Sequence, residues 1–284
     1  MQSFYGGQSS VFLYMGKKFE ALQKILKELG KPVIAFSGGV DSAVLLKIAA
    51  GTLGKENVVA VTAVSPTYTG EEKREAVKIA KSFGVRHILA ETEEFRDKNF
   101  VSNTPERCFF CKKELFEKLE EIRRQNGFDY IADGTNKDDE KDFRPGEKAK
   151  KLYPVRSPLR EAAITKKEIR LYAKNAGLSY WNKPSMACLA SRIPYGRKIT
   201  PAGIERISEG ERFLKKLGFT EVRLRDYGDT ARIEVARGEM GNALRMGDRI
   251  SKRMKKLGYT YVTLDLEGFR SGSMNRALEK KGGT

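Results

Sequence analysis

A glycine-rich string, Ser37-Gly38-Gly39-Val40-Asp41-Ser42, carries the clearest chemistry in the chain. Two glycines let the backbone approach an anion closely, and the N–H groups that begin a following helix would attract that anion. Ser37 and Ser42 add hydroxyl donors. A carboxylate repels phosphate, so Asp41 is better suited to hold Mg²⁺ or to cap the helix. The string therefore predicts a site for nucleotide phosphates.

Three cysteines form the second reactive group. Cys108 and Cys111 are three residues apart at the start of an expected helix, so their thiols share one face. Arg107, Lys112 and the helix N-terminus would lower the pKa values of both thiols and favour the thiolates. Cys188 lies much further along the chain. An odd number of cysteines with a C-x-x-C pair favours a reduced, cytoplasmic protein over a disulfide framework.

Residue types alone leave several uses of these thiols open. A structural zinc site takes four protein ligands, a set that three cysteines and the single His87 complete poorly. A [4Fe–4S] cluster on three thiolates would keep one iron open to carry a hydrosulfide. A persulfide relay between cysteines is another alternative, and three unrelated buried thiols would need no chemistry at all.

The composition of the whole chain limits its partners. Its 284 residues are 40% apolar, enough for an ordinary core, and carry a formal net charge of +17. That charge favours anions: nucleic acid, nucleotides, phosphorylated small molecules or an acidic protein. No stretch approaches the roughly 18 apolar residues of a membrane-spanning helix. The N-terminal residues lack the pattern of a secretory signal, so we expect a cytoplasmic protein with no membrane partner.

The hydrophobic pattern alternates strands with helices over most of the chain. This alternation predicts an α/β fold with a parallel, doubly wound sheet. The Ser37–Ser42 string would then lie at the carboxyl end of the first strand. The expected strands are 32–36, 58–64, 85–90 and 128–132, and the expected helices are 17–29, 41–50, 71–83, 108–125 and 164–176.

The pattern changes toward the C-terminus. Polar, turn-rich segments follow the fourth strand and precede residue 200. From there a helix (202–217), strands (221–225, 231–236), another helix and a last strand (259–264) predict a smaller α+β domain. We therefore expect an N-terminal extension over 1–16, a nucleotide-binding domain over 17–200 and a C-terminal substrate or oligomerisation domain over 201–284.

The phosphate string resembles the PP-loop of ATP pyrophosphatases. The chain has no G-x-x-x-x-G-K-[ST] motif, so a Walker loop is excluded. The resemblance implies the adenine nucleotide alpha hydrolase-like fold and ATP cleavage between the α- and β-phosphates. AMP then passes to a substrate oxygen, which a nitrogen or sulfur nucleophile displaces.

Further motifs, from about residue 17 to 270, resemble the LarE family. They are Arg107-Cys-Phe-Phe-Cys-Lys-Lys-Glu-Leu, Asp133-Gly-Thr-Asn with Asp138, Asp139 and Arg144-Pro-Gly, Ser157-Pro-Leu, Ala187-Cys-Leu-Ala-Ser-Arg-Ile-Pro-Tyr-Gly, Val222-Arg-Leu-Arg and Ala231-Arg-Ile-Glu-Val. The resemblance implies an ATP-dependent sulfurtransferase of nickel-pincer nucleotide (lactate racemase cofactor) biosynthesis. It would adenylate a carboxylate of pyridinium-3,5-biscarboxylic acid mononucleotide and convert it to a thiocarboxylate, releasing AMP and pyrophosphate.

The family includes two types, and the cysteines distinguish them. One type sacrifices a cysteine sulfur and keeps dehydroalanine; here that cysteine would be Cys188. The other uses three cysteines and a [4Fe–4S] cluster to pass on sulfur from sulfide or a donor protein, and Cys108, Cys111 and Cys188 match it. The resemblance also implies a homo-oligomer, a hexamer or a dimer.

Position and residue type assign the remaining roles. Thr135 and Asn136 end the fourth strand, at the carboxyl edge where α/β proteins bind ligands. Guanidinium groups match phosphate geometry, which makes Arg192, Arg223 and Arg225 candidates for the substrate phosphate. Two carboxylates, Glu211 and Glu234, would orient substrate or metal, or form surface salt bridges. The ATP site is assigned to Ala35, Ser37, Gly38, Gly39, Asp41, Ser42, Gly134 and Thr135, with Asp41 on Mg²⁺.

Three rival functions use the same loop. A tRNA thiolase fits the +17 charge, but the chain has neither paired C-x-x-C ribbons nor an added RNA-binding domain, so tRNA is the less favoured partner. Amide formation, as in NAD or GMP synthesis, would use ammonia and need no cysteine trio. A regulatory module would bind ATP without substrate-dependent release of pyrophosphate.

Overall fold

The computed structural model describes residues 6–141, 145–183 and 188–270, with side chains from residue 16 onward. Arg144 and the expected structure over 184–187 and 271–284 lie outside the described residues. The chain divides into two compact units. The first contains Met1–Ser65, Gly70–Glu93 and Cys108–Met186, and the second contains Pro66–Thr69, Glu94–Arg107 and Ala187–Thr284. The division into domains near residue 200 stays a prediction.

The first unit is built on a five-stranded parallel sheet, as the alternating pattern predicts. Its strands are β1 (Pro32–Ala35), β2 (Val59–Val64), β3 (Arg86–Glu91), β4 (Tyr130–Ala132) and β5 (Val155–Arg156). Their order is β3-β2-β1-β4-β5, with every pair parallel. The chain winds outward from β1 to β3 and then returns to the other side of β1. The carboxyl ends of β1 and β4 therefore meet at a topological switch point, where open α/β sheets bind ligands.

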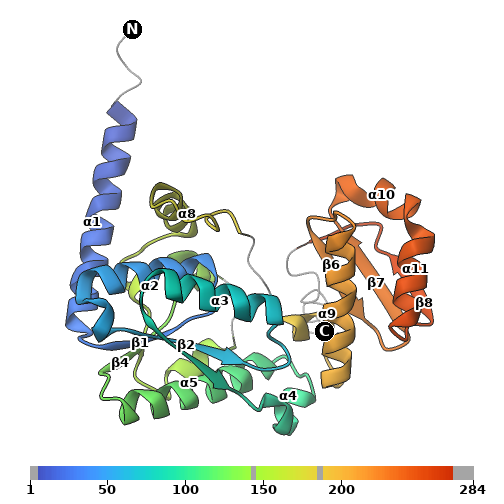
Figure 1. Ribbon diagram of the computed structural model, residues 1–284, viewed down its shortest axis with the longest axis horizontal. Helices are drawn as coiled ribbons and strands as arrows, with labels where there is room; N and C mark the ends of the chain where they lie inside the picture. The colour runs from blue at the N-terminus through green and yellow to red at the C-terminus, as the bar shows by residue number, and fades with distance from the viewer. Residues whose placement is uncertain (1–5, 142–144, 184–187, 271–284) are drawn as a thin grey trace, which may run out of the picture. The chain divides into compact units, whose positions relative to one another are not determined.

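Helices cover both faces of this sheet (Figure 1). The longer ones are α1 (Gly6–Glu28), α2 (Val40–Leu53), α3 (Gly70–Ser82), α5 (Arg107–Gln125) and α8 (Lys166–Asn175). Alternate strand residues face opposite layers. Ile34 and Ala60 pack in the core with α1, α2, α3 and α8, whereas Val33 and Val59 pack with Phe116 of α5. The doubly wound arrangement is confirmed.

The differences from the expected elements have local causes. Helix α1 begins at Gly6 rather than at residue 17, and its sequence contains no proline that would stop it earlier. Strand β5 was not expected, because only Val155 and Arg156 form it. Short helices α6 (Glu147–Lys150) and α7 (Pro158–Glu161) are not among the expected elements, and α6 lies in a stretch that we expect to be loop. Segments this short carry too few residues for a periodic pattern.

The second unit contains the smaller sheet. Strands β6 (Val222–Asp226), β7 (Thr230–Val235) and β8 (Tyr261–Leu264) lie in the order β6-β7-β8, antiparallel and then parallel. Helices α9 (Pro201–Lys216), α10 (Met240–Arg245) and α11 (Gly247–Lys256) accompany them. One face of the sheet, with Leu224 and Ile233, packs against Leu214 and Met254. Register places Arg223 opposite Glu234 on the other face.

Two short segments complete this unit. They are α4 (Lys98–Val101) and the 3₁₀ turn η4 (Leu189–Arg192), which follows Cys188. Asn103 joins them, because its fully buried amide donates to the carbonyl oxygens of Ile193 and Pro194. Among the described residues, no helix has the length and apolar character needed to cross a membrane.

Gly210 of α9 provides a test of this packing. A Cβ there would come within 2.2 Å of Leu224 Cδ2 in the core. We expect Gly210→Ala to lower the free energy of unfolding by about 1–3 kcal/mol through overpacking, measured by urea denaturation. Gly51 of α2 has no atom within 4 Å of its Cβ position, so the matched control Gly51→Ala should be neutral or stabilising. Equal effects of the two substitutions would contradict this account.

Candidate active site

The phosphate string forms the turn between β1 and α2. Gly39 is the N-cap of α2, and glycine has no side chain that could cap the helix. The first N–H groups of a helix have no intrahelical partner and attract anions. Ser37 and Ser42 close the turn, with their hydroxyl oxygens 3.2 Å apart, while Ser42 Oγ donates to Gly39 O at 3.1 Å. Ser37 N donates to Ser42 Oγ and Gly39 N donates to Ser37 Oγ, each at 3.3 Å, so the serine hydroxyls shape the backbone of the turn.

Two glycines make this turn fit its surroundings. Gly38 has a φ of +72°, and a Cβ there would lie 3.2 Å from Ala76 Cβ. Gly134, just after β4, would place a Cβ 3.0 Å from the backbone N of Ser42. A side chain at Gly134 would therefore displace the N-terminus of α2. The loops after β1 and β4 touch backbone to backbone at the switch point.

Asp41 is paired with a lysine from a distant part of the chain. Lys166 Nζ, at the start of α8, lies 2.7 Å from Asp41 Oδ1 and 2.6 Å from Oδ2. Asn136 Nδ2 approaches Oδ2 at 3.5 Å. Burial raises the pKa of Asp41, with Lys166 opposing the change. A partly buried carboxylate beside a phosphate turn fits Mg²⁺, which binds one or two carboxylates and takes other oxygens from phosphates.

A buried ion pair holds the loop after β4. Lys150 Nζ lies 2.7 Å from Asp133 Oδ2 and donates to Thr135 Oγ1 at 2.7 Å, and both charged side chains are more than nine-tenths buried. Ser157 Oγ donates to Asp133 Oδ1 at 2.8 Å. Thr135 Oγ1 donates in turn to Asp133 Oδ2 at 2.9 Å. This network fixes the turn that carries Gly134.

The C-x-x-C pair lies in the first turn of α5. Cys108 is exposed and Cys111 is partly exposed. The expectation that Arg107 acts on these thiols is not met, because its buried guanidinium donates to Asn103 Oδ1 and Ala190 O. Lys112 Nζ lies over the Phe116 ring, 5.7 Å from its centroid. Two accessible thiols on one helix face are suitable donors for a cluster iron.

Cys108 and Cys111 belong to the first unit and Cys188 to the second. Across the described residues, no three Cys, His, Asp or Glu side chains are grouped to hold a metal ion. His87 Nε2 instead lies 2.8 Å from Thr62 Oγ1. Support for a [4Fe–4S] cluster therefore comes from the chemistry of the three thiols.

The predicted phosphate and carboxylate residues of the second unit do come together. Arg192 and Glu211 form a bidentate pair at 2.8 and 3.2 Å, and Arg225 and Glu234 form another at 2.9 and 2.8 Å. All four residues are at least 95% buried. Both glutamates thus form the salt bridges to arginine that the alternative interpretation predicts, but in buried rather than surface positions.

Arg223 differs from its two neighbours. Within the described residues it forms no ion pair; its guanidinium donates to Val222 O and lies 4.8 Å from the centre of the Phe269 ring. Burial and the nearby guanidinium groups of Arg192 and Arg225 lower its pKa. Arg232 also contacts Glu234, at 3.0 Å, and Asp265, at 3.5 Å. In the described part of this unit, the group therefore contains four guanidinium groups and three carboxylates, which leaves one positive charge in excess. That excess makes the half-buried Arg223 a candidate partner for a phosphate.

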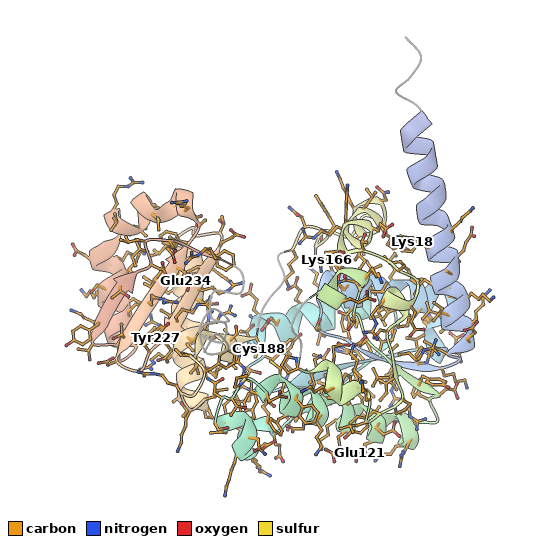
Figure 2. All side chains as sticks on the ribbon, turned by 180° about the vertical axis from the view of Figure 1, so that it is seen from behind. Lys18, Glu121, Lys166, Cys188, Tyr227 and Glu234 are labelled. Atoms are coloured by element: carbon orange, nitrogen blue, oxygen red, sulfur yellow. The ribbon has the colours of Figure 1, made fainter. Side chains whose placement is uncertain are left out.

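The arginines of these two pairs also bind the backbone around Cys188. Arg192 Nη1 donates to Cys188 O at 3.2 Å, and Arg225 Nη1 donates to Ser191 O at 3.0 Å. Figure 2 marks Cys188 and Glu234 within this unit. The arginine–glutamate pairs therefore position the backbone that carries the third cysteine.

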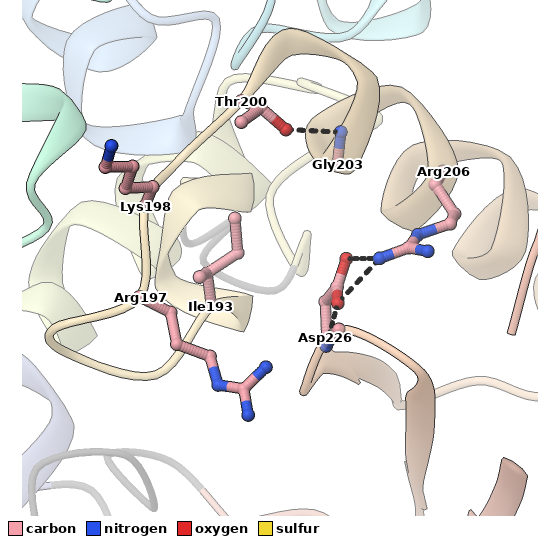
Figure 3. Close-up of a pocket in the computed structure, with 8 residues that line it drawn as sticks. Ile193, Arg197, Lys198, Thr200, Gly203, Arg206 and Asp226 are labelled. Atoms are coloured by element: carbon pink, nitrogen blue, oxygen red, sulfur yellow. Dashed lines mark hydrogen bonds and ion pairs between the residues drawn. The ribbon is translucent and has the colours of Figure 1, made fainter. Parts of the chain in front are cut away.

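A separate cavity of about 260 Å³ lies near the start of α9 (Figure 3). Arg206 Nη2 binds both oxygens of Asp226, at 2.8 and 2.6 Å, and Gly203 N donates to Thr200 Oγ1 at 3.1 Å. Arg197 Nη1 donates to Tyr227 O. The contact between Arg206 and Asp226 joins α9 to the end of β6.

The sequence identified most of these residues but missed two lysines. Ala35 ends β1 and Gly134 lies against Ser42, whereas the ATP contacts expected of Ala35, Gly134 and Thr135 stay predictions. Lys150 and Lys166 were not selected, because each lies in a run of charged residues that resembles an exposed surface. For Lys166 the only local signal is Thr165, whose capping box with Glu168 marks the start of α8.

The parallel order and the glycine-rich turn after β1 define a PP-loop α/β nucleotide-binding protein, and residues 15–114 match the NAD synthase family. The chain is 39% identical over 266 residues to the pyridinium-3,5-bisthiocarboxylic acid mononucleotide synthase of Lactiplantibacillus plantarum, covering 94% of this chain and 96% of that protein. It belongs to this synthase family, the LarE family.

Two further relatives define the breadth of the similarity. An uncharacterized protein of Synechocystis is 41% identical over 266 residues, covering 93% of this chain and 98% of that protein. A tRNA-specific 2-thiouridylase of Desulforamulus reducens is 29% identical over 197 residues, which is 54% of this chain and 52% of the thiouridylase. The similarity to the synthase thus extends over both units, and that to the tRNA enzyme covers about half the chain.

The Asp133–Lys150 pair predicts a pH dependence of stability. Burial favours the protonated acid, but Lys150 and the hydrogen bonds outweigh it, so the pKa of Asp133 lies below its ordinary 3.8. A lowered pKa gives stability that is complete above the unfolded value and lost as the pH falls through the folded one. Asp133→Asn should cost about 1–3 kcal/mol at neutral pH, because the buried Lys150 would keep only Glu147, at 2.7 Å, as a carboxylate partner, and less below pH 3.8.

Urea denaturation of both proteins from about pH 7 to about pH 3 would measure this difference across the range in which a carboxyl group titrates. Exposed Asp229 provides the control, and Asp229→Asn should leave stability unchanged throughout. A cost of Asp133→Asn that stays constant over the series would contradict the prediction.

Proposed function

We propose that this chain is an ATP-dependent sulfurtransferase that converts a carboxylate of pyridinium-3,5-biscarboxylic acid mononucleotide to a thiocarboxylate, in nickel-pincer nucleotide biosynthesis. One observation carries the proposal most directly: Arg192 donates a hydrogen bond to Cys188 O, and Arg225 donates one to Ser191 O. The backbone of Cys188 is thereby held beside the group of arginines that includes Arg223. A sulfur-bearing residue beside a phosphate-binding group suits a mononucleotide whose carboxylate receives sulfur.

The turn between β1 and α2 supports the activation step. Its serine hydroxyls and the N-terminus of α2 would hold the β- and γ-phosphates of ATP. A carboxylate oxygen of the substrate attacks the α-phosphorus, the bond to the β-phosphate breaks, and pyrophosphate leaves. Asp41 would hold Mg²⁺, which neutralises charge on the phosphates when bound.

The second step replaces oxygen by sulfur. A hydrosulfide attacks the acyl carbon of the adenylate, and AMP departs with the original carboxylate oxygen. A [4Fe–4S] cluster held by Cys108, Cys111 and Cys188 would supply sulfur from outside the chain. The accessible C-x-x-C pair in the first turn of α5 supports this route.

Two alternatives remain distinct from this route. If no cluster binds, Cys188 itself becomes the sulfur donor and would be converted to dehydroalanine. A tRNA thiolase would use the same turn and the same positive charge. The LarE-like similarity over both units favours the mononucleotide, and tight tRNA binding with a steep salt dependence would favour the thiolase.

The proposed phosphate contact can be tested at Arg223. Arg223→Met should raise the KM for the mononucleotide by about 30- to 150-fold, because a charge-assisted contact contributes about 2–3 kcal/mol. The KM for ATP should not change. Substrate-dependent release of pyrophosphate measures both constants, and exposed Arg237→Met is the control. A change confined to ATP would contradict the assignment.

The cluster can be tested after anaerobic purification and reconstitution. The wild-type chain should hold iron and sulfide with the broad absorbance of a cluster, and Cys111→Ala should lose both. Pyrophosphate release should survive in that variant while thiocarboxylate formation fails. If the reconstituted wild-type chain holds no iron, the cluster is ruled out. If mass spectrometry after turnover shows that Cys188 has lost the mass of hydrogen sulfide, the sacrificial route is established.

A further inference from the structure

Lys166 occupies an unusual position for a lysine beside a phosphate turn. Its ammonium is within 2.7 Å of both carboxylate oxygens of Asp41, and both side chains are about three-quarters buried. Figure 2 marks this lysine in the first unit. Asp41 is the residue best suited to hold Mg²⁺, so the ammonium lies where a divalent cation would be bound.

The surroundings of the pair contain an excess of acid. Asp139 acts on Asp41 through its negative charge. Asp138 accepts a hydrogen bond from the backbone N of Lys166 at 2.8 Å. Asp139 also accepts a hydrogen bond from Asn136 N at 2.9 Å. A partly buried carboxylate with a second one nearby is stabilised by a positive charge, and Lys166 supplies that charge to Asp41.

The backbone of Lys166 is fixed independently of its ammonium. Thr165 and Glu168 form a capping box at the start of α8. Lys18 Nζ anchors Glu168 from α1 at 2.9 Å. A lysine side chain has four flexible carbons, so its ammonium can change partner while α8 stays in place.

We propose that Lys166 neutralises Asp41 until a divalent cation arrives with ATP, and that its ammonium is then released to donate to phosphate oxygens. This inference rests on the ATP half of the proposed function and not on the sulfur chemistry. Lys166 thus competes with metal for Asp41, which keeps the carboxylate from binding a divalent cation before the nucleotide. It then adds a positive charge to the phosphates.

Cation binding without nucleotide tests the competition directly. Mn²⁺ is the probe, and the electron paramagnetic resonance signal of free Mn²⁺ reports binding. Lys166→Met should bind Mn²⁺ about tenfold more tightly than wild type, equivalent to about 1.4 kcal/mol. Lys166→Arg keeps the charge and should resemble wild type, as should Lys167→Met, which changes an exposed neighbour. Circular dichroism would establish that each variant is folded.

The release step has its own readout. Lys166→Met should bind ATP about tenfold more weakly in the presence of Mg²⁺, measured by calorimetry, whereas Lys167→Met should not. Unchanged or weaker Mn²⁺ binding by Lys166→Met would overturn the competition, and unchanged ATP binding would overturn the release. Asp41→Asn separates the two proposals: if it binds Mn²⁺ with ATP as well as wild type does, the metal role of Asp41 fails, independently of Lys166.

Discussion

The close approach of Gly134 to the N-terminus of α2 is the constraint on which the nucleotide site depends. A Cβ at Gly134 would lie 3.0 Å from Ser42 N, so the turn after β4 supports the turn after β1 through backbone alone. The parallel order creates this meeting, because β1 and β4 are neighbours that leave the sheet at the same edge. The Asp133–Lys150 pair then holds the second turn in place.

In both units, charged side chains near the candidate sites are paired with opposite charges of the same unit. Asp41 with Lys166, and Glu234 with Arg225, place opposite charges within 3 Å in buried or partly buried positions. Such pairs add little net stability, because desolvation offsets the attraction. Their effect is to fix geometry. Each carboxylate holds its cation in a defined position near the ligand site.

The sequence determined the sheet and most of the site because their signals are local. A β-branched run followed by Ser-Gly-Gly predicts both β1 and the turn after it, and the C-x-x-C spacing predicts a shared helix face for Cys108 and Cys111. Lys150 and Lys166 escaped prediction for a physical reason. Their burial arises from contacts with residues far away in the sequence, and neighbouring lysines in the same runs stay exposed.

The role expected of Arg107 failed for a related reason. Sequence proximity to Cys108 placed a positive charge beside the thiol, but the side chain turns to Asn103 and Ala190 and lies over the Tyr195 ring. A buried guanidinium must satisfy its donors, and backbone carbonyl groups do so without a second charge. Arg223 presents the opposite case, since its neighbours on β6 and η4 have carboxylate partners and it has an aromatic ring instead. A charged side chain such as Arg223, which has no ion-pair partner among the described residues, therefore indicates a ligand site better than a charged side chain that is only close to a reactive residue in the sequence.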